Sequence, residues 1–208
     1  MSSLVMFDYD GVIVDSLNVF RSAFDTACRK CSGYRTDSDA ALMELFDGNL
    51  FEGMKNLGMN NRQIDHTLKT FETLISERLD SINFFSGMAD ALKTISRGNI
   101  IFIVTSNVSH IASRVLEKNG IDFVKDVLGA EKEKSKAKKI SDTMTRYTNH
   151  PAYYVGDTSG DIIEGRSAGA LTVAVTWGWH DAGKLKEASP DFMVSSPAEL
   201  TALICAPG

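Results

Sequence analysis

From about residue 84 onward, short β-prone runs alternate with segments of helical periodicity. The runs cover residues 100–104, 123–124, 152–155 and 171–175, and a similar apolar run at residues 4–7 stands near the N-terminus. Strands separated by helices are typical of a parallel sheet whose two faces are covered by those helices. The pattern therefore predicts an α/β fold in which residues 4–7 form the first strand.

Only helical periodicity is visible between that first strand and the later alternation. From residue 16 to about residue 79, apolar side chains recur at spacings of three and four residues, without a convincing strand pattern. We therefore expect a helical insertion after the first strand. A chain of 208 residues with 43% hydrophobic content is long enough to bury a core of this kind.

Charge and hydropathy restrict the classes of function. The formal net charge of −5 gives no general attraction for nucleic acid, and no signal peptide or apolar run of membrane-spanning length is visible. We therefore expect a cytoplasmic protein that acts on a small molecule and binds neither nucleic acid nor membrane. Three cysteines favour a reducing compartment over a disulfide framework, and Cys28 and Cys31 are interpreted as side chains of one helix face rather than zinc ligands.

Polar side chains follow three of the predicted strands at the point where each strand ends. Ligands bind at the carboxyl ends of the strands in open parallel sheets, so these side chains are expected to meet at one edge. Each alone could be a helix cap or a turn residue, but their joint occurrence favours a site. The candidates are Asp8, Asp10, Gly11, Thr105, Ser106, Asn107, Asp157 and Asp161, together with Lys136 behind the predicted helix N-cap Ser135.

Such groups are suited to phosphoryl transfer. Mg²⁺ favours carboxylate oxygens and keeps waters that a phosphate oxygen can replace, so the aspartates predict a magnesium site. Asp8 is placed to attack phosphorus and form an aspartyl-phosphate, while Asp10 can protonate the leaving oxygen and then deprotonate water. The Thr105 hydroxyl, neighbouring backbone N–H groups and the Lys136 ammonium can stabilise charge on the phosphoryl oxygens, and Gly11 allows a tight turn beside them.

Four segments, in this order, resemble the four motifs of the haloacid dehalogenase-like hydrolases. They are DYDGVIVDS at residues 8–16, VTSN at 104–107, the SK of EKSKAKK at 135–136 and VGDTSGD at 155–161. The resemblance implies a Rossmann-like three-layer αβα core formed by residues 1–15 and 83–208. It also implies an α-helical cap domain inserted at residues 16–82.

Roles for individual residues follow from the same resemblance. Family members with an aspartate two residues after the nucleophile are phosphatases and phosphomutases, so the resemblance implies that Asp10 argues against dehalogenation. Mg²⁺ is implied to bind the Asp8 carboxylate, the Asp10 backbone carbonyl and Asp157, with Asp161 assisting directly or through water. The site lysine is interpreted as Lys136, and Lys134 stays open as the alternative, because the proline that often follows this lysine is replaced by alanine here.

The substrate class is the least specified part of the prediction. GVIVDS at residues 11–16 and VTWGWH at 175–180 are most similar to phosphoglycolate phosphatase and its neighbours, which implies a small phosphorylated metabolite as substrate. Residues 46–53 are expected to contact it, and His180 lies either near the site mouth or in an exposed loop. A phosphomutase and a non-catalytic phospho-ligand-binding module remain alternatives, and the sequence leaves monomer and homodimer undecided.

Overall fold

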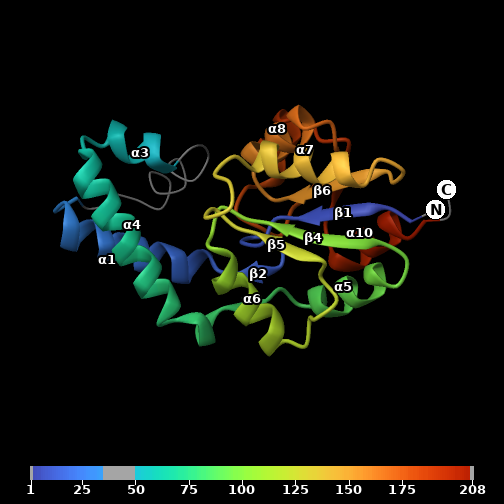
Figure 1. The fold of residues 1–208 in the computed structure, drawn as a ribbon, viewed down its shortest axis with the longest axis horizontal. Coiled ribbons are helices and arrows are strands. Elements are labelled where there is room, and N and C mark those ends of the chain that lie inside the picture. The colour runs from blue at the N-terminus through green and yellow to red at the C-terminus, as the bar shows by residue number, and fades with distance from the viewer. Residues whose placement is uncertain (1, 35–49, 207–208) are drawn as a thin grey trace. The chain divides into compact units, whose positions relative to one another are not determined.

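The computed structural model describes residues 2–34 and 50–206, and the chain divides into two compact units. One unit combines Met1–Asp15 with Asn83–Gly208, and the other is Ser16–Ile82. The first contains a parallel sheet with helices on both faces, whereas the described part of the second is helical (Figure 1). The helical unit is thus an insertion into the α/β unit.

Six parallel strands form the central sheet of the α/β unit, in the order β5-β4-β1-β6-β7-β8. Strand β1 lies between β4 and β6, and all four of its residues are buried, as expected for a strand with both faces covered. The strands are β1 (Leu4–Phe7), β4 (Ile100–Val104), β5 (Asp126–Leu128), β6 (Ala152–Gly156), β7 (Leu171–Val175) and β8 (Phe192–Val194).

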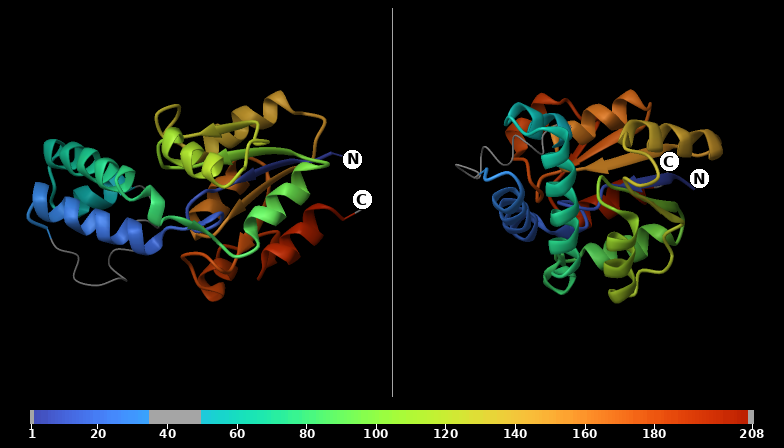
Figure 2. Two further views of the ribbon diagram at one scale, coloured as in Figure 1. Left: turned by 90° about the horizontal axis from the view of Figure 1, so that it is seen from below. Right: turned by 60° about the vertical axis from the view of Figure 1, so that its left-hand side comes forward.

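Helices pack against both faces of this sheet. Helices α7 and α8 lie along one face, while α5, α6 and α10 lie along the other (Figure 1), and Figure 2 shows α5 and α10 side by side. One core cluster joins Ile140 of α7 to apolar side chains of β1, β4, β5 and β6. The helices are α5 (Met88–Ser96), α6 (Ser109–Lys118), α7 (Lys136–Arg146), α8 (Ser159–Ser167), α9 (Ala182–Glu187) and α10 (Pro197–Ile204).

Strand register brings the ends of three strands together. Phe7, the last residue of β1, pairs with Ile103 of β4 and with Val155 of β6. The Asp8 N–H continues the ladder by donating to the Val155 carbonyl at 2.8 Å. The residues that follow β1, β4 and β6 therefore meet at one edge of the sheet.

The chain enters and leaves the helical insertion through a two-stranded antiparallel sheet. Strand β2 (Val14–Asp15) pairs with β3 (Asn83–Phe84), and the Phe85 N–H donates to the Ile13 carbonyl at 3.0 Å. This pairing holds the two ends of the insertion side by side, immediately after the turn that carries Asp8 and Asp10.

Buried apolar side chains hold the helical unit together. Its described elements are α1 (Leu17–Cys31), α3 (Leu50–Asn56), α4 (Asn61–Ser76) and the 3₁₀ helix η1 (Leu79–Ser81). Cys28 is buried in a cluster with Phe24, Met54, Met59 and Ile64, and Cys31 on the same helix is a free thiol. Both cysteines thus act as helix-face side chains, and no metal-ligand cluster includes them among the described residues.

Some sequence predictions of strands were wrong. Residues 123–124 are not a strand; the pairing begins two residues later, where Asp126 aligns with Phe102 of β4. The short strands β2, β3 and β8 were not predicted, because runs of two or three residues carry little periodicity.

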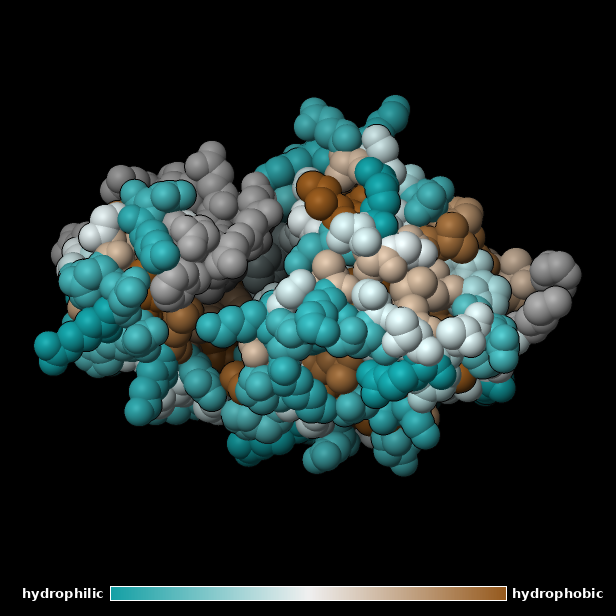
Figure 3. Space-filling view, turned by 45° about the horizontal axis from the view of Figure 1, so that its top comes forward, coloured by the Kyte–Doolittle hydropathy of each residue, from teal (hydrophilic) through white to brown (hydrophobic). Residues whose placement is uncertain are grey.

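Hydrophilic residues predominate on the face drawn in Figure 3, and none of the described helices has the length and apolarity to span a membrane.

Candidate active site

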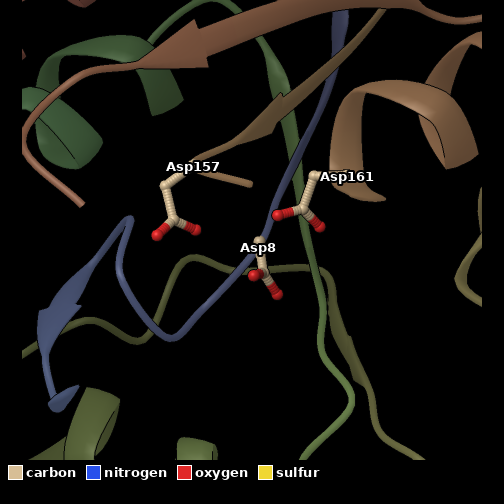
Figure 4. Close-up of side chains that lie close together, drawn as sticks. All are labelled: Asp8, Asp157 and Asp161. Atoms are coloured by element: carbon tan, nitrogen blue, oxygen red, sulfur yellow. The ribbon is translucent and has the colours of Figure 1, made fainter. Parts of the chain in front are cut away.

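Three buried carboxylates converge at the sheet edge. Asp8 follows β1, Asp157 follows β6, and Asp161 lies in the first turn of α8 (Figure 4). Each offers an oxygen, and these oxygens lie within 4.8 Å of one another. Burying three carboxylates so close together is unfavourable unless cations or hydrogen-bond donors compensate their charge.

Lys136 supplies one such cation. Its Nζ lies 3.0 Å from Asp8 Oδ1 and 2.7 Å from Asp161 Oδ1. Ser135 caps α7 by accepting the Lys138 N–H, so Lys136 is the first residue of the helix, and its side chain is buried. Burial opposes the charge, but Asp161 and Asp8 outweigh it and raise the Lys136 pKa well above its usual value. Lys134, the alternative considered from sequence, is exposed.

Asp161 is fully occupied by hydrogen-bond donors. Its Oδ1 accepts from Lys136 Nζ and from the Tyr154 hydroxyl at 3.0 Å. Its Oδ2 accepts from the Thr158 hydroxyl at 2.7 Å and the Thr158 N–H at 3.2 Å. Burial alone would raise the Asp161 pKa, yet Lys136 and these donors hold it below the usual value. Asp161 therefore orients Lys136, and its saturation favours a contribution to metal binding through water.

The Asp157 carboxylate, unlike that of Asp161, is only partly satisfied by hydrogen-bond donors among the described residues. Its Oδ2 accepts the Trp179 N–H at 2.7 Å, but its Oδ1 is buried and has no hydrogen-bond partner in the described part of the chain. Burial, reinforced by the charges of Asp161 and Asp8, raises its pKa well above the usual value. An unpaired buried carboxylate oxygen beside a second carboxylate is the donor arrangement that a hard cation fits.

Two glycines enclose the Asp157 carboxylate. Gly11 has a φ of +80°, and a Cβ there would lie 2.0 Å from Asp157 Oδ2. A Cβ on Gly178 would lie 2.3 Å from Asp157 Cβ and 2.5 Å from the Gly11 carbonyl. Any other residue at either position would displace the carboxylate.

Asp8 and Asp10 differ in their surroundings. Burial raises the Asp8 pKa to about 8, with Lys136 opposing the shift and the Asp161 and Asp10 charges adding to it. Asp10 is partly exposed, and its backbone pairs with Val14 in the turn after β1. A buried nucleophile candidate is therefore followed, two residues later, by an aspartate that is less buried as a residue although its Oδ1 is buried.

The end of β4 completes this edge. Thr105 is buried, and its Oγ1 accepts the Asn107 N–H at 2.9 Å. Ser106 is exposed, and the Asn107 Nδ2 is buried without a hydrogen-bond partner among the described residues. Because β4 pairs with β1, these groups lie at the strand end next to Asp8.

Comparison with known proteins shows which family the chain resembles. Residues 5–175 match the haloacid dehalogenase-like hydrolase family. The chain belongs to this family. A phosphoglycolate phosphatase from Synechococcus elongatus is 28% identical over 200 residues, covering 94% of each chain. A pyrophosphatase from Oceanobacillus iheyensis is 24% identical, covering 96% of this chain and 95% of its own.

Solved structures share the fold of this haloacid dehalogenase-like hydrolase. A family member from Streptococcus pneumoniae has a TM-score of 0.84 at 23% identity, covering 97% of this chain and 98% of its own. A hydrolase from Pseudomonas syringae has a TM-score of 0.78 at 18% identity, covering 97% and 96% respectively. These two solved structures thus share the fold of this chain over nearly its whole length.

Sequence reasoning missed several residues that shape the site of this hydrolase. Tyr154 and Thr158 bind Asp161, Gly178 packs against Asp157, and Lys139 donates to the Thr105 carbonyl at 2.7 Å. The spacing of Lys136 and Lys139 at i and i+3 on one predicted helix was the available signal for the second lysine.

Two further sequence predictions have different outcomes. His180 is buried, and its Nδ1 accepts the Ser159 N–H at 3.0 Å, so the exposed-loop interpretation is wrong. Residues 46–49 of the expected substrate-contact stretch lie outside the described residues, and the remainder of that stretch belongs to α3.

Proposed function

We propose that this hydrolase is a Mg²⁺-dependent phosphatase that cleaves a small phosphomonoester through an aspartyl-phosphate on Asp8. The observation that carries the proposal is the buried Asp8 carboxylate, 3.0 Å from Lys136 Nζ, beside an Asp157 oxygen that has no hydrogen-bond partner among residues 2–34 and 50–206. The first feature suits a nucleophile toward an anionic substrate, and the second suits a metal ligand.

The residues present fit a magnesium ion. The Asp8 carboxylate, the Asp10 backbone carbonyl and Asp157 would hold it, with Asp161 contributing through water. When bound, Mg²⁺ supplies charge neutralisation among these carboxylates and polarises a phosphoryl oxygen. The raised pKa of Asp157 reflects the electrostatic cost of this arrangement without a cation.

Asp8 and Asp10 divide the chemistry. An Asp8 oxygen forms a bond to phosphorus as the bond from phosphorus to the ester oxygen breaks, and the leaving oxygen takes the proton of Asp10. Asp10, now ionised, accepts a proton from water. That water attacks the aspartyl-phosphate, which releases phosphate and regenerates Asp8.

The remaining groups bind and orient the phosphoryl oxygens. Lys136 is held between Asp8 and Asp161, so its ammonium is fixed next to the nucleophile. The Thr105 hydroxyl accepts from the Asn107 N–H, which leaves its own hydrogen to donate to an anion. Donors that are fixed before the reaction stabilise developing charge more effectively than donors that must reorganise.

The substrate class is supported by the relatives. Curated relatives covering nearly the whole chain are named phosphoglycolate phosphatase and pyrophosphatase, so small phosphorylated metabolites are the candidate substrates. We propose that the helical unit Ser16–Ile82 acts as the cap that selects among them. The negative net charge supports a small-molecule partner rather than nucleic acid, and a cytoplasmic location suits such a partner.

A substrate panel tests the proposal. Phosphate release is measured from phosphoglycolate, pyrophosphate, p-nitrophenyl phosphate and other small phosphomonoesters, with Mg²⁺ or with EDTA. Wild type is expected to hydrolyse at least one of these esters, and only with Mg²⁺, while Asp8→Asn is inactive. Asp122→Asn, which makes the same change at an exposed aspartate, is the control and should behave as wild type. Turnover by Asp8→Asn would overturn the nucleophile assignment, and binding without turnover by wild type would favour the phosphomutase or binding-module alternatives.

A further inference from the structure

A second buried lysine of α7 contacts the end of β4. Lys139 is 4% exposed, and its Nζ donates to the Thr105 carbonyl oxygen at 2.7 Å. It lies three residues after Lys136, so both side chains leave the same face of the helix. Its acceptor belongs to the residue that supplies the candidate hydroxyl of the site.

The contact acts on a single peptide unit. The Thr105 carbonyl and the Ser106 N–H belong to the same planar trans peptide, in which the two groups point in opposite directions. Fixing the carbonyl on Lys139 therefore fixes the direction of the Ser106 N–H. In the described part of the chain this N–H donates to no protein acceptor, so it is available to a ligand.

Stability alone does not explain this lysine. A buried ammonium is costly, and the charged groups facing Lys139 include another cation: Lys136 on α7 repels it, whereas Asp8 after β1, Glu164 on α8 and Glu131 before α7 attract it. Among the described residues, the ammonium of Lys139 donates a hydrogen bond to one neutral group, the Thr105 carbonyl. Methionine has similar length and no charge, so it would fill the same space at lower desolvation cost.

We propose that Lys139 is a positioning residue that aims the Ser106 N–H and the Thr105 hydroxyl at the phosphoryl group through the Thr105 carbonyl. The inference rests on the proposed phosphatase function. A donor whose direction is fixed can favour the transition state over the ground state, because the three phosphoryl oxygens become coplanar only in the transition state.

Kinetics of Lys139→Met, with Lys138→Met as the matched control, test the inference. Lys138 is the neighbouring residue, but it is exposed and paired with Asp142 on the surface. With the best ester of the panel, Lys139→Met is expected to lower kcat roughly 10- to 100-fold and to weaken inhibition by orthovanadate similarly. KM and inhibition by inorganic phosphate should change less than about threefold, and the melting temperature should not fall. Lys138→Met should match wild type.

Other outcomes are equally informative. A kcat within twofold of wild type would overturn the inference. So would a fall in melting temperature together with an equal weakening of orthovanadate and phosphate, because that pattern indicates a structural role. Lys139→Arg, which keeps a charged donor, should recover part of kcat. Wild type without turnover would instead remove the proposed function, so the two failures are distinguishable.

Discussion

Gly11 packs so closely against Asp157 that a Cβ on Gly11 would lie 2.0 Å from the Asp157 Oδ2. Gly11 thus meets two requirements. It adopts a φ of +80°, and it leaves room for the Asp157 carboxylate, which follows the neighbouring strand β6. The conformational requirement and the steric requirement can be separated by mutation.

Gly11→Ala should abolish the site, whereas Gly120→Ala should not. Gly120 also has a positive φ, of +68°, but has no atom within 4 Å of an added Cβ. Each alanine is expected to cost about 1 kcal/mol of stability for its backbone conformation, and Gly11→Ala more because Asp157 must move. We expect activity to fall at least roughly 100-fold in Gly11→Ala only. Steady-state kinetics and urea unfolding measure both effects; equal activity of the two variants would contradict the packing argument.

Asp157→Asn should make the metal-free protein more stable while removing its response to Mg²⁺. The amide is isosteric and can still accept the Trp179 N–H, but it removes a buried charge next to Asp8 and Asp161. We expect a gain of about 1–3 kcal/mol in EDTA, the usual cost of a buried unpaired polar group. Wild type should gain about 2.7 kcal/mol at Mg²⁺ 100-fold above its dissociation constant, and the variant none.

Thermal unfolding of both proteins in EDTA and in Mg²⁺ decides this prediction. Asp122→Asn is the control, since Asp122 is exposed and its substitution removes the same charge from the surface. A metal-free Asp157→Asn less stable than wild type would show that the Asp157 charge is compensated without a cation.

Asp161→Asn should have the opposite effect on stability. The two carboxylate oxygens of Asp161 accept four hydrogen bonds, so an amide at this position sets its own N–H against one of those donors. The substitution also removes one of the two carboxylates that pair with Lys136 and keeps the other, Asp8. The expected loss is about 3–5 kcal/mol, typical of breaking a buried ion pair. Urea unfolding in EDTA measures it, with Asp157→Asn as the internal comparison. A loss below about 1 kcal/mol would mean that Asp161 does not hold Lys136.

The sequence was informative wherever a motif residue follows a buried strand. Asp8, Thr105 and Asp157 are adjacent because β1, β4 and β6 are neighbours in register, and apolar runs ending in polar residues predict such a meeting. The choice of Lys136 over Lys134 needed the helix start, which Ser135 already indicated as an N-cap.

What could not be predicted depends on contacts between elements. The saturation of Asp161 needs the Tyr154 hydroxyl from the strand before it, and the enclosure of Asp157 needs Gly178 from a loop after β7. Neither contact has a periodic signature in the sequence, because each depends on how α8 and the loop after β7 pack on the sheet. Lys139 was missed for a related reason: in a lysine-rich run only the helix phase against β4 separates a buried lysine from a surface one.

Stability should depend on pH through Lys139. Burial first, and then the Lys136 charge, lower its pKa from the usual 10.5 to about 8. Between pH 8 and 10.5 the unfolded chain therefore binds more protons at this residue than the folded chain does. The free energy of unfolding of wild type should accordingly rise with pH across this window relative to Lys139→Met.

Below pH 8 the difference between the two proteins should be constant, because Lys139 is then protonated in both states. Urea midpoints in EDTA at pH 7, 8, 9 and 10 measure this difference. Lys138→Met is the control: pairing with Asp142 raises the Lys138 pKa, so its difference from wild type should be flat up to pH 10. A flat Lys139→Met difference as well would mean that Lys139 keeps its ordinary affinity for protons despite its burial against Thr105 and Lys136.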